Sequence, residues 1–350
     1  MTLLRRQSLT AYATPLCETV VECPQPRGTE VLVRVWRCGV CHSDLHMQDG
    51  YFLLGAEKKL DVRGGRTLPF TLGHEIAGVI ERAGPEADAA AGREVAVFPW
   101  IGCGTCAACR AGEENLCGDA RHLGIYADGG FASHVLVPHP RYLLDYAPLP
   151  PSFAGALMCS GLTAYSALKR LVDRAQRGPV LLVGMGGVGM MGLALARHLF
   201  PQAPIVADID PAKREAALQA GAAAAFDPAD PGARKALQAR TGGIPAACDF
   251  VGSESSLQFA HGALTRAGKL VITGLLGGTF STPIALFAIK ALSIEGVLAG
   301  TLTEARELFD IARAGKITPL PISERPLEEA QSALDDLRAG RVVGRVVLTA

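Results

Sequence analysis

The sequence is poor in aromatic side chains and carries no net charge. Phe, Trp and Tyr make up 6% of the 350 residues. Lys and Arg number 34, as do Asp and Glu, so the formal net charge is zero. A protein that neutralises nucleic-acid phosphates or an anionic membrane surface needs a basic excess. The charge balance therefore argues against a nucleic-acid or membrane partner.

The sequence also lacks an unbroken apolar stretch of membrane-spanning length. Two charge-free segments, 178–196 and 270–289, approach that length, but Gly and Pro interrupt both. They are expected to be buried parallel strands followed by loop or helix. The first seven residues contain no apolar core of a signal peptide, so a cytoplasmic, reducing location is expected.

The first part of the chain has the pattern of a β domain. Short β-type runs, separated by Gly and Pro, lie at 30–36, 75–81, 93–98 and 131–137. This pattern predicts an antiparallel, partly closed sheet. Because domains usually hold about 100–200 residues, the length of the chain leaves room for a second one.

Residues 150–300 alternate between short apolar runs and helical stretches. The runs lie at 180–184, 204–210, 246–252, 269–275 and 292–298, and the helical stretches at 211–220 and 232–241. The alternation is typical of βαβ units and predicts a doubly wound parallel sheet of the α/β class. The Ala-rich stretch 219–226 indicates a helix end that runs into a strand. Two helices and a last strand are predicted at 303–314, 327–339 and 341–348.

Four of the ten cysteines are closely spaced. Cys103, Cys106, Cys109 and Cys117 have the spacing C-x2-C-x2-C-x7-C. Four thiolates close a tetrahedron around Zn²⁺ and leave no open position, which suits a structural role. An iron–sulfur cluster also takes four cysteines, and a run of buried thiols is the remaining alternative. The spacing favours structural zinc.

A glycine-rich loop follows the apolar run 180–183. Gly184, Gly186 and Gly189 form G-x-G-x-x-G, with Gly187 between them, and an apolar helical stretch comes next. In this strand–turn–helix context the loop is typical of a dinucleotide-binding site. Asp208 lies 19 residues after Gly189, where a carboxylate binds ribose hydroxyls and repels a 2′-phosphate, which favours NAD over NADP. Asp210 competes for this role, although Pro211 after it suits a helix N-cap.

Further metal-type residues are scattered outside these two motifs. They occur in the segment Cys41 to His46, at His74-Glu75 and at Cys159. A single buried Cys or His is more often a packed core residue than a ligand. The density of the first segment nevertheless makes a second metal site worth testing.

Taken together, the motifs resemble those of zinc-dependent alcohol dehydrogenases of the medium-chain dehydrogenase/reductase superfamily, in particular the prokaryotic NAD-dependent branch. The matching segments are 41–46, 72–78, 103–117, 129–135, 159–163 and 184–189. The resemblance runs from end to end. It implies a mainly β, GroES-like catalytic domain at 1–152 with a structural-zinc lobe near 100–120. It also implies a Rossmann NAD-binding domain at 153–300, and a return to the catalytic domain at 301–350.

The resemblance also implies a catalytic site and two zinc ions per chain. Cys41, His74 and Cys159 would ligate the catalytic zinc and leave a fourth position open for the alcohol. Asp44 would orient His74, and Glu75 would lie behind the metal. Ser43 would take the alcohol proton and pass it, through the nicotinamide ribose, to His46.

For the cofactor, the resemblance places Val188 and Thr163 behind the nicotinamide, and His42 and Arg345 at the pyrophosphate. His42 departs from the Arg of many relatives. Lys213 would lie near the adenosine ribose, unless it is simply a solvated helix lysine. The substrate pocket is expected to contain an indole and aliphatic neighbours, namely Trp100, Leu53, Ile125 and Leu276.

The implied activity is the NAD-dependent interconversion of primary or secondary, apolar or aryl alcohols with aldehydes or ketones. A zinc-dependent polyol dehydrogenase of the sorbitol type is the alternative enzyme, and it would need a more polar pocket. A zinc-free quinone-type reductase would lack both cysteine sets. A zinc-finger-type binding protein would carry one zinc instead of two. The resemblance also implies a homo-oligomer, a tetramer rather than a dimer, in which the strand at 292–298 pairs between subunits.

Overall fold

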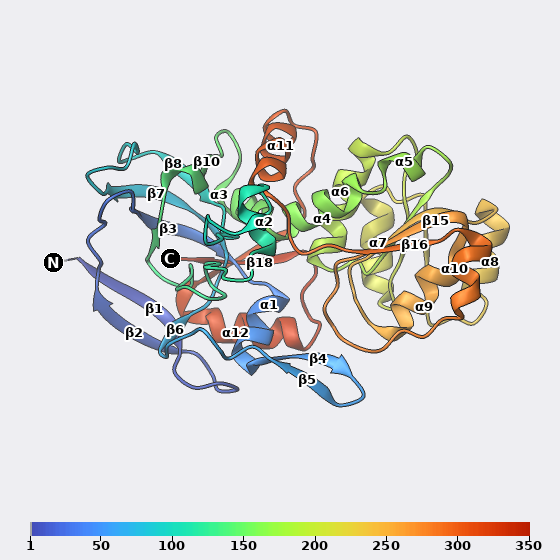
Figure 1. Cartoon of the computed structure of the whole chain (residues 1–350), viewed down its shortest axis with the longest axis horizontal. Helices are drawn as coiled ribbons and strands as arrows, with labels where there is room; N and C mark the ends of the chain where they lie inside the picture. Colours follow the sequence, from blue (N-terminus) through green and yellow to red (C-terminus); the bar gives the residue numbers. More distant parts are fainter. Residues whose placement is uncertain (1) are drawn as a thin grey trace.

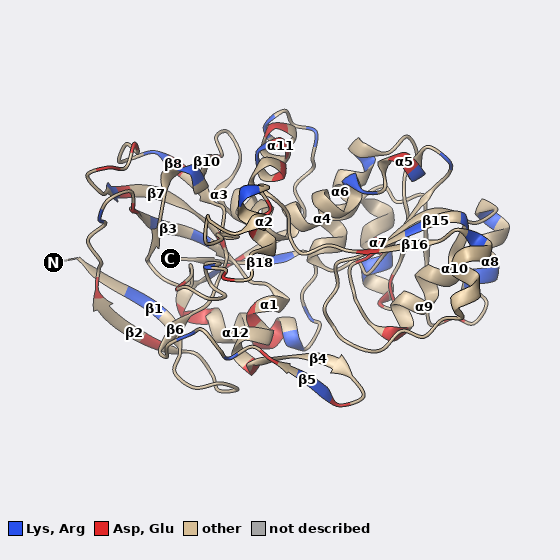
Figure 2. Cartoon of the chain, viewed as in Figure 1, with Lys and Arg blue, Asp and Glu red and all other residues tan. Residues whose placement is uncertain are grey.

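The chain folds into two halves, each built on its own sheets (Figure 1). The structure is a computed structural model and describes residues 2–350. One half contains the N-terminal strands and the C-terminus, and the other holds the middle of the chain. Residues that carry charges of both signs are interspersed along the ribbon of the two halves (Figure 2). Within residues 2–350, no helix combines the length and apolar character needed to cross a bilayer.

The larger sheet joins segments from both ends of the chain. Its order is β10-β8-β7-β3-β18-β17, and β9 also pairs with β3. These strands are β3 (Val31–Gly39), β7 (Glu75–Ala83), β8 (Glu94–Val97), β9 (His134–Val137), β10 (Leu143–Asp145), β17 (Ile322–Pro326) and β18 (Arg345–Thr349). Because β18 runs antiparallel to β3, the C-terminal strands complete the N-terminal half. The β runs predicted in the first part of the chain are confirmed to within a few residues.

Two smaller sheets accompany it. A three-stranded sheet has the order β2-β1-β6, and β4 and β5 form a hairpin. Their bounds are β1 (Leu3–Leu9), β2 (Cys17–Glu22), β6 (Phe70–Thr71), β4 (Tyr51–Gly55) and β5 (Lys58–Asp61). This hairpin has no recognisable sequence signal, since its turn places Ala56 and Glu57 at positive φ, where Asn-Gly or Asp-Gly is usual.

The second half is a six-stranded parallel sheet of order β13-β12-β11-β14-β15-β16. The strands are β11 (Val180–Val183), β12 (Ile205–Ala207), β13 (Ala224–Phe226), β14 (Ile244–Asp249), β15 (Leu264–Ile272) and β16 (Ser293–Gly296). In sequence order this is 3-2-1-4-5-6, the order of doubly wound dinucleotide-binding sheets. The predicted parallel sheet is confirmed, as is the strand at the end of the Ala-rich stretch.

Helices cover the parallel sheet and join the two halves. In the first half are α1 (His42–Asp49), α2 (Ala107–Arg110), the 3₁₀ turns η1 (Glu114–Leu116) and η2 (Pro140–Tyr142), and α3 (Pro151–Ala156). A π-helical turn, η3 (Leu157–Gly161), leads into α4 (Leu162–Lys169) and α5 (Val172–Ala175). Around the parallel sheet are α6 (Gly187–Leu199), α7 (Pro211–Gln219), α8 (Ala233–Thr241), α9 (Glu254–Ala263) and α10 (Ile284–Lys290). The chain ends with α11 (Leu302–Arg313), η4 (Leu327–Glu329) and α12 (Ala330–Arg338) before β18.

The predicted helices 211–220, 232–241, 303–314 and 327–339 are confirmed as α7, α8, α11 and the pair η4–α12. The last strand begins at Arg345 and not at Arg341 as predicted. Arg341 still belongs to the turn after α12, where its guanidinium pairs with Asp336. Gly344, at φ +81°, then turns the chain into β18.

The carboxyl ends of the central parallel strands are aligned. Val183 is in register with both Ala207 and Asp249, and Asp249 with Ile272. The loops after these strands therefore leave the sheet at one edge. In doubly wound sheets, ligands bind at this edge, where the strand order reverses. One large cluster of buried side chains extends through both halves, so the edge faces the first half at a packed junction.

Candidate active site

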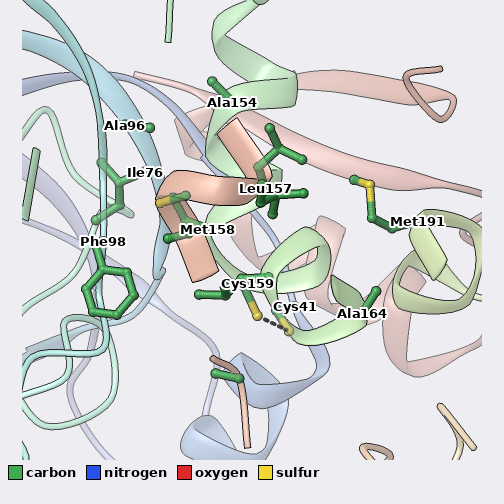
Figure 3. Close-up of a cluster of buried hydrophobic side chains, with 14 of the residues drawn as sticks. Cys41, Ile76, Ala96, Phe98, Ala154, Leu157, Met158, Cys159, Ala164 and Met191 are labelled. Carbon is green, nitrogen blue, oxygen red and sulfur yellow. Dashed lines mark hydrogen bonds between the residues drawn. The ribbon is translucent and has the colours of Figure 1, made fainter. Parts of the chain in front are cut away.

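The π-helical turn η3 presents Cys159 at the junction of the two halves. All five residues of the turn are buried. In Figure 3 the Cys159 sulfur faces Cys41, whereas Met158 points toward Ile76 and Phe98 in the core. The extra residue of a π turn changes side-chain direction within a helix, and such turns often occur at functional sites. The π turn thus directs the Cys159 thiol toward Cys41 and away from the core around Met158.

Cys41 lies at the N-cap of α1, at the end of β3. The Asp44 carboxylate accepts the Cys41 backbone N–H at 2.8 Å, which anchors the first turn. The Sγ atoms of Cys41 and Cys159 are 3.9 Å apart. The hydrogen bond from Cys159 holds the pKa of Cys41 well below its ordinary value, against the effect of burial. Cys41 is therefore favoured as a thiolate, the form that binds metals.

His74 completes a ligand set with the two thiols. Its Nδ1 lies 3.3 Å from Oδ1 of Asp44, and both side chains are fully buried. Asp44 also accepts the Gly73 backbone N–H at 3.2 Å. Burial lowers the pKa of His74, but the Asp44 and Cys41 anions outweigh burial and raise it well above its ordinary value. Asp44 lies where a carboxylate orients a ligand imidazole through Nδ1 and leaves Nε2 for a metal.

Glu75 lies beside this set and forms a buried ion pair with Arg345 of β18. Burial raises the pKa of the Glu75 carboxyl, and the Arg345 cation opposes the rise. The other carboxylate oxygen, Oε2, is buried and has no hydrogen-bond partner among residues 2–350. One ligand atom each of Cys41, His74, Glu75 and Cys159 lies within 4.8 Å of the others.

These donors fit a zinc ion. With Zn–S bonds of about 2.3 Å, two thiolates on a tetrahedral zinc lie about 3.8 Å apart. The separation of 3.9 Å between Cys41 and Cys159 matches this value and is far from a disulfide bond. Two thiolates and one imidazole provide three protein ligands, the number found at zinc sites that keep an open position.

The four-cysteine segment also gathers its sulfur atoms. Sγ of Cys103 lies 4.0 Å from that of Cys109, and Sγ of Cys106 lies 3.8 Å from that of Cys117. All four lie within 4.8 Å of one another. The backbone N–H of Cys109 and that of Cys103 donate to Cys106 and Cys117. The geometry fits a closed tetrahedral zinc site.

A cavity of ≈ 340 Å³ connects the Cys41–Cys159 pair to the carboxyl edge of the parallel sheet. Most of the predicted site residues line it, namely Cys41, His42, Ser43, His46, Trp100, Cys159, Thr163, Gly184, Gly186, Gly187, Val188, Gly189, Asp208, Lys213, Leu276 and Arg345. Leu53 and Ile125, the other expected pocket residues, are not part of its lining. Leu53 is on the exposed hairpin β4–β5, and Ile125 is buried in the core.

The glycine-rich loop has the close packing that the motif predicts. A Cβ on Gly189 would lie 1.7 Å from the Gly184 carbonyl oxygen, and one on Gly187 would meet the Arg345 side chain. A Cβ on Gly186 would meet no atom of the described residues within 4 Å. Since Gly186 is also the N-cap of α6 and offers no capping side chain, the helix N-terminus is open to the cavity. This arrangement suits a pyrophosphate.

Asp208 follows β12 at the same edge. Its Oδ2 accepts the Met185 N–H at 2.6 Å and its Oδ1 the Asp210 N–H at 2.9 Å. A carboxylate has further lone pairs, so these bonds orient Asp208 and still leave acceptors for ribose hydroxyls. Asp210 is the N-cap of α7, as its neighbour Pro211 suggested, and its Oδ1 accepts the Ala212 N–H.

Two histidines on α1 face the cavity one turn apart. Desolvation by the surrounding protein lowers the pKa values of both His42 and His46 below the ordinary value. The His46 ring packs 4.5 Å from the ring of Phe52, centroid to centroid. Both imidazoles are therefore favoured as neutral near neutral pH, the form in which an imidazole accepts a proton.

Trp100 forms a wall beside His74. Its Nε1 donates to the Met158 carbonyl at 2.9 Å, and its ring centroid lies 5.6 Å from that of His74. The π turn that presents Cys159 thus also fixes the indole. No sequence pattern predicts this bond. Three cavity segments were missed too: 250–251, 273–275 and 297–299. Each follows a parallel strand, so the strand-end rule could have found them.

Comparisons with known proteins agree with this geometry. Residues 27–148 match the family model for the alcohol dehydrogenase GroES-like domain, and residues 187–314 match that for zinc-binding dehydrogenases. An NAD-dependent alcohol dehydrogenase of Sulfurisphaera tokodaii is 36% identical over 99% of both chains.

Two solved structures extend the comparison. The alcohol dehydrogenase of Aeropyrum pernix is 31% identical, with a TM-score of 0.85 over 99% of this chain and 100% of the other. The D-arabinose dehydrogenase of Sulfolobus solfataricus is 26% identical, with a TM-score of 0.86 over the whole of both chains. The chain belongs to the zinc-dependent alcohol dehydrogenase family of the medium-chain dehydrogenase/reductase superfamily, and it is an oxidoreductase.

Proposed function

We propose that this protein interconverts primary and secondary, apolar or aryl alcohols with aldehydes or ketones, using NAD and two zinc ions per chain. The cavity carries the proposal, because it joins the Cys41–Cys159 pair to the open N-terminus of α6. The catalytic zinc is assigned to Cys41, His74 and Cys159, and the structural zinc to the four cysteines of 103–117. When bound, the catalytic zinc supplies Lewis acidity toward the alcohol oxygen and NAD accepts the hydride.

The residues of the chain bind and orient the reactants around that chemistry. The α6 N-terminus, Arg345 and His42 would hold the pyrophosphate, since all three line the cavity. Asp208 and Lys213 hold the adenosine ribose, and Val188 and Thr163 support the nicotinamide. We assign Ser43 as the group that accepts the alcohol proton, since it lies on the cavity wall two residues after Cys41. We assign His46 as the group that releases the proton to solvent.

Trp100 and the aliphatic residues Leu276, Val297 and Leu298 give the cavity an apolar wall. This wall favours alkyl or aryl groups over polyols. A sugar or polyol dehydrogenase is the second candidate, because the similar structure from Sulfolobus solfataricus is a D-arabinose dehydrogenase. Such a substrate would need polar partners for each hydroxyl group.

We also propose a homo-oligomer, with a tetramer expected. β16 is an outer strand of the parallel sheet, and the neighbouring Ile284, Ile289 and Leu298 are exposed. An open edge next to apolar side chains suits pairing with a second copy. The domain limits 1–152, 153–300 and 301–350, and a cytoplasmic location, likewise stay predictions.

The test is NADH or NADPH formation by the purified protein with primary aliphatic, secondary aliphatic, benzylic, polyol and aldose substrates. We expect turnover with NAD on the aliphatic and benzylic members and little on polyols or aldoses. Preference for polyols or aldoses would replace the proposal with the second candidate. Turnover with none of them would contradict both.

A further inference from the structure

The turn η1 of the four-cysteine lobe touches the cofactor-binding half of the molecule. Asn115 lies in this turn, two residues before Cys117, and is buried. Its Nδ2 donates to the Leu298 carbonyl oxygen at 2.7 Å, a contact across 183 residues of sequence. Because a carbonyl oxygen only accepts hydrogen bonds, the amide nitrogen of Asn115 must face Leu298. The other amide atom, Oδ1, is buried with no partner in the described part of the chain.

The neighbour of Asn115 anchors the same turn to the first half. The Glu114 carboxylate accepts the Gly102 N–H, the Tyr142 hydroxyl at 2.6 Å and the Arg141 guanidinium at 2.8 Å. These bonds hold η1 against the start of the lobe and against η2. The backbone that carries Asn115 is therefore held in place, so the hydrogen bond to the Leu298 carbonyl restrains the position of that carbonyl.

Leu298 belongs to the segment Val297–Ala299, which lies between β16 and α11 (Figure 1). This segment lines the cavity. At one end, Val297 donates its N–H to the Ile272 carbonyl at the end of β15. At the other end, Ala299 has φ +50°, a conformation that costs energy for a residue with a Cβ. A segment that carries strain needs contacts that hold it in place, and Asn115 supplies one.

The position of this segment in the strand order indicates which part of the cofactor it would contact. In a doubly wound sheet the two mononucleotides bind to opposite halves of the strand order. Asp208 follows β12, which lies on one side of β11 in the strand order. Val297 follows β16, the outermost strand on the other side. The segment is therefore expected on the nicotinamide side of the cavity, whose lining also includes Cys41, Cys159 and Trp100.

We propose that Asn115 is a positioning residue that holds the Val297–Ala299 wall of the nicotinamide site from the four-cysteine lobe. This inference rests on the proposed function. It gives the lobe a role beyond its own folding, because the fold of the lobe sets the shape of the cofactor site in the other half. The residue acts through a backbone carbonyl, so it does not touch the reacting atoms.

The test compares Asn115→Asp with the wild type and with Leu116→Ala. The Asp side chain has the same shape but presents an acceptor to the Leu298 carbonyl, so the contact becomes repulsive. Leu116 is the next residue of the same turn, and its exposed side chain makes Leu116→Ala the matched control. NADH binding is measured by fluorescence titration of the full chain, alongside zinc content, melting temperature, and kcat and KM for NAD.

For Asn115→Asp we expect the NADH dissociation constant and the KM for NAD to rise about tenfold, the combined effect of losing one buried hydrogen bond and placing two acceptors against each other. We expect kcat to change by less than about twofold, because the wall orients the cofactor without entering the chemical step. Zinc content and melting temperature should match those of Leu116→Ala, which should bind NADH like the wild type.

Unchanged NADH binding in Asn115→Asp would overturn the inference and leave the proposed function intact. Loss of zinc or of thermal stability in this variant would also overturn it, since Asn115 would then serve the folding of the lobe. If the wild type neither binds NADH nor turns over an alcohol, the proposed function fails, and the inference falls with it. Asn115→Ala provides a second variant that removes the donor without adding repulsion, and a smaller shift in the same direction is expected.

Discussion

The two cysteine sites of this protein differ in how the chain builds them. The four-cysteine lobe takes all its sulfur atoms from one loop, 103–117, and three of its four cysteines are partly exposed. The Cys41–His74–Cys159 site takes its side chains from three distant segments and buries all of them. In the proposed assignment, four thiolates would close the first site, whereas three ligands would hold the metal of the second, which adjoins the cavity. A closed local site suits the holding of a loop, and an open buried site suits chemistry.

The largest expected effect comes from removing a ligand of the open site. Cys159→Ala should reduce kcat at least about a hundredfold, more than is usual when a residue supporting a ligand is lost. NADH binding should persist, because the glycine-rich loop is untouched. Alcohol oxidation and NADH fluorescence titration measure the two properties. Cys17→Ser, at an exposed cysteine outside both sites, is the control and should behave like the wild type. Substantial activity in Cys159→Ala would remove it from the ligand set.

Removing a ligand of the closed site should instead affect stability. Metal-binding energy at a structural site is folding energy, so Cys106→Ser should unfold the lobe at lower temperature. If about 2–3 kcal/mol is lost, the melting temperature falls by roughly 5–10 °C for a domain of this size. Differential scanning calorimetry with zinc analysis checks this. The comparison breaks if Cys106→Ser keeps its melting temperature and loses only turnover, as expected for Cys159→Ala.

A third substitution tests how the cavity next to the open site selects its cofactor. Asp208→Gly removes the negative charge that repels a 2′-phosphate, so the ratio of kcat/KM with NAD to that with NADP should fall about tenfold. Steady-state kinetics with both cofactors measures it. Asp210→Asn, in the adjacent helix cap, is the control and should leave the ratio unchanged. An unaltered ratio in Asp208→Gly would place cofactor discrimination elsewhere.

The smallest expected effect concerns proton release. Burial lowers the pKa of His46, so its imidazole stays neutral and able to accept a proton down to a pH below its ordinary value. Below the lowered pKa the His46 imidazole of the wild type is protonated and can no longer accept a proton. Above neutrality, base in the solvent accepts the proton in its place. His46→Gln should therefore slow alcohol oxidation by a few-fold, most clearly between the lowered pKa and neutrality. A pH profile parallel to that of the wild type would exclude His46 from proton release.

The difference between the sites also explains what the sequence could predict. The spacing of 103–117 and of the glycine-rich loop is local, so both motifs could be recognised without a structure, and the parallel sheet followed from alternating apolar runs. The meeting of Cys41, His74 and Cys159 depends on where β3, β7 and η3 lie in space, and only the family resemblance suggested it. Leu53 and Ile125 lie outside the lining of the cavity because pocket walls depend on side-chain direction. The Asn115–Leu298 contact crosses the two halves and has no local signal.

The most direct test is graded removal of zinc from the wild-type protein, with metal content, turnover and melting temperature followed together. Two zinc ions per chain are expected at the start. Removal of the first zinc should abolish alcohol oxidation and leave the melting temperature little changed, because the buried open site can be reached through the cavity and does not hold the fold together. Removal of the second zinc should lower the melting temperature. A single zinc per chain, or the loss of turnover and stability in one step, would contradict the division into an open catalytic site and a closed structural site.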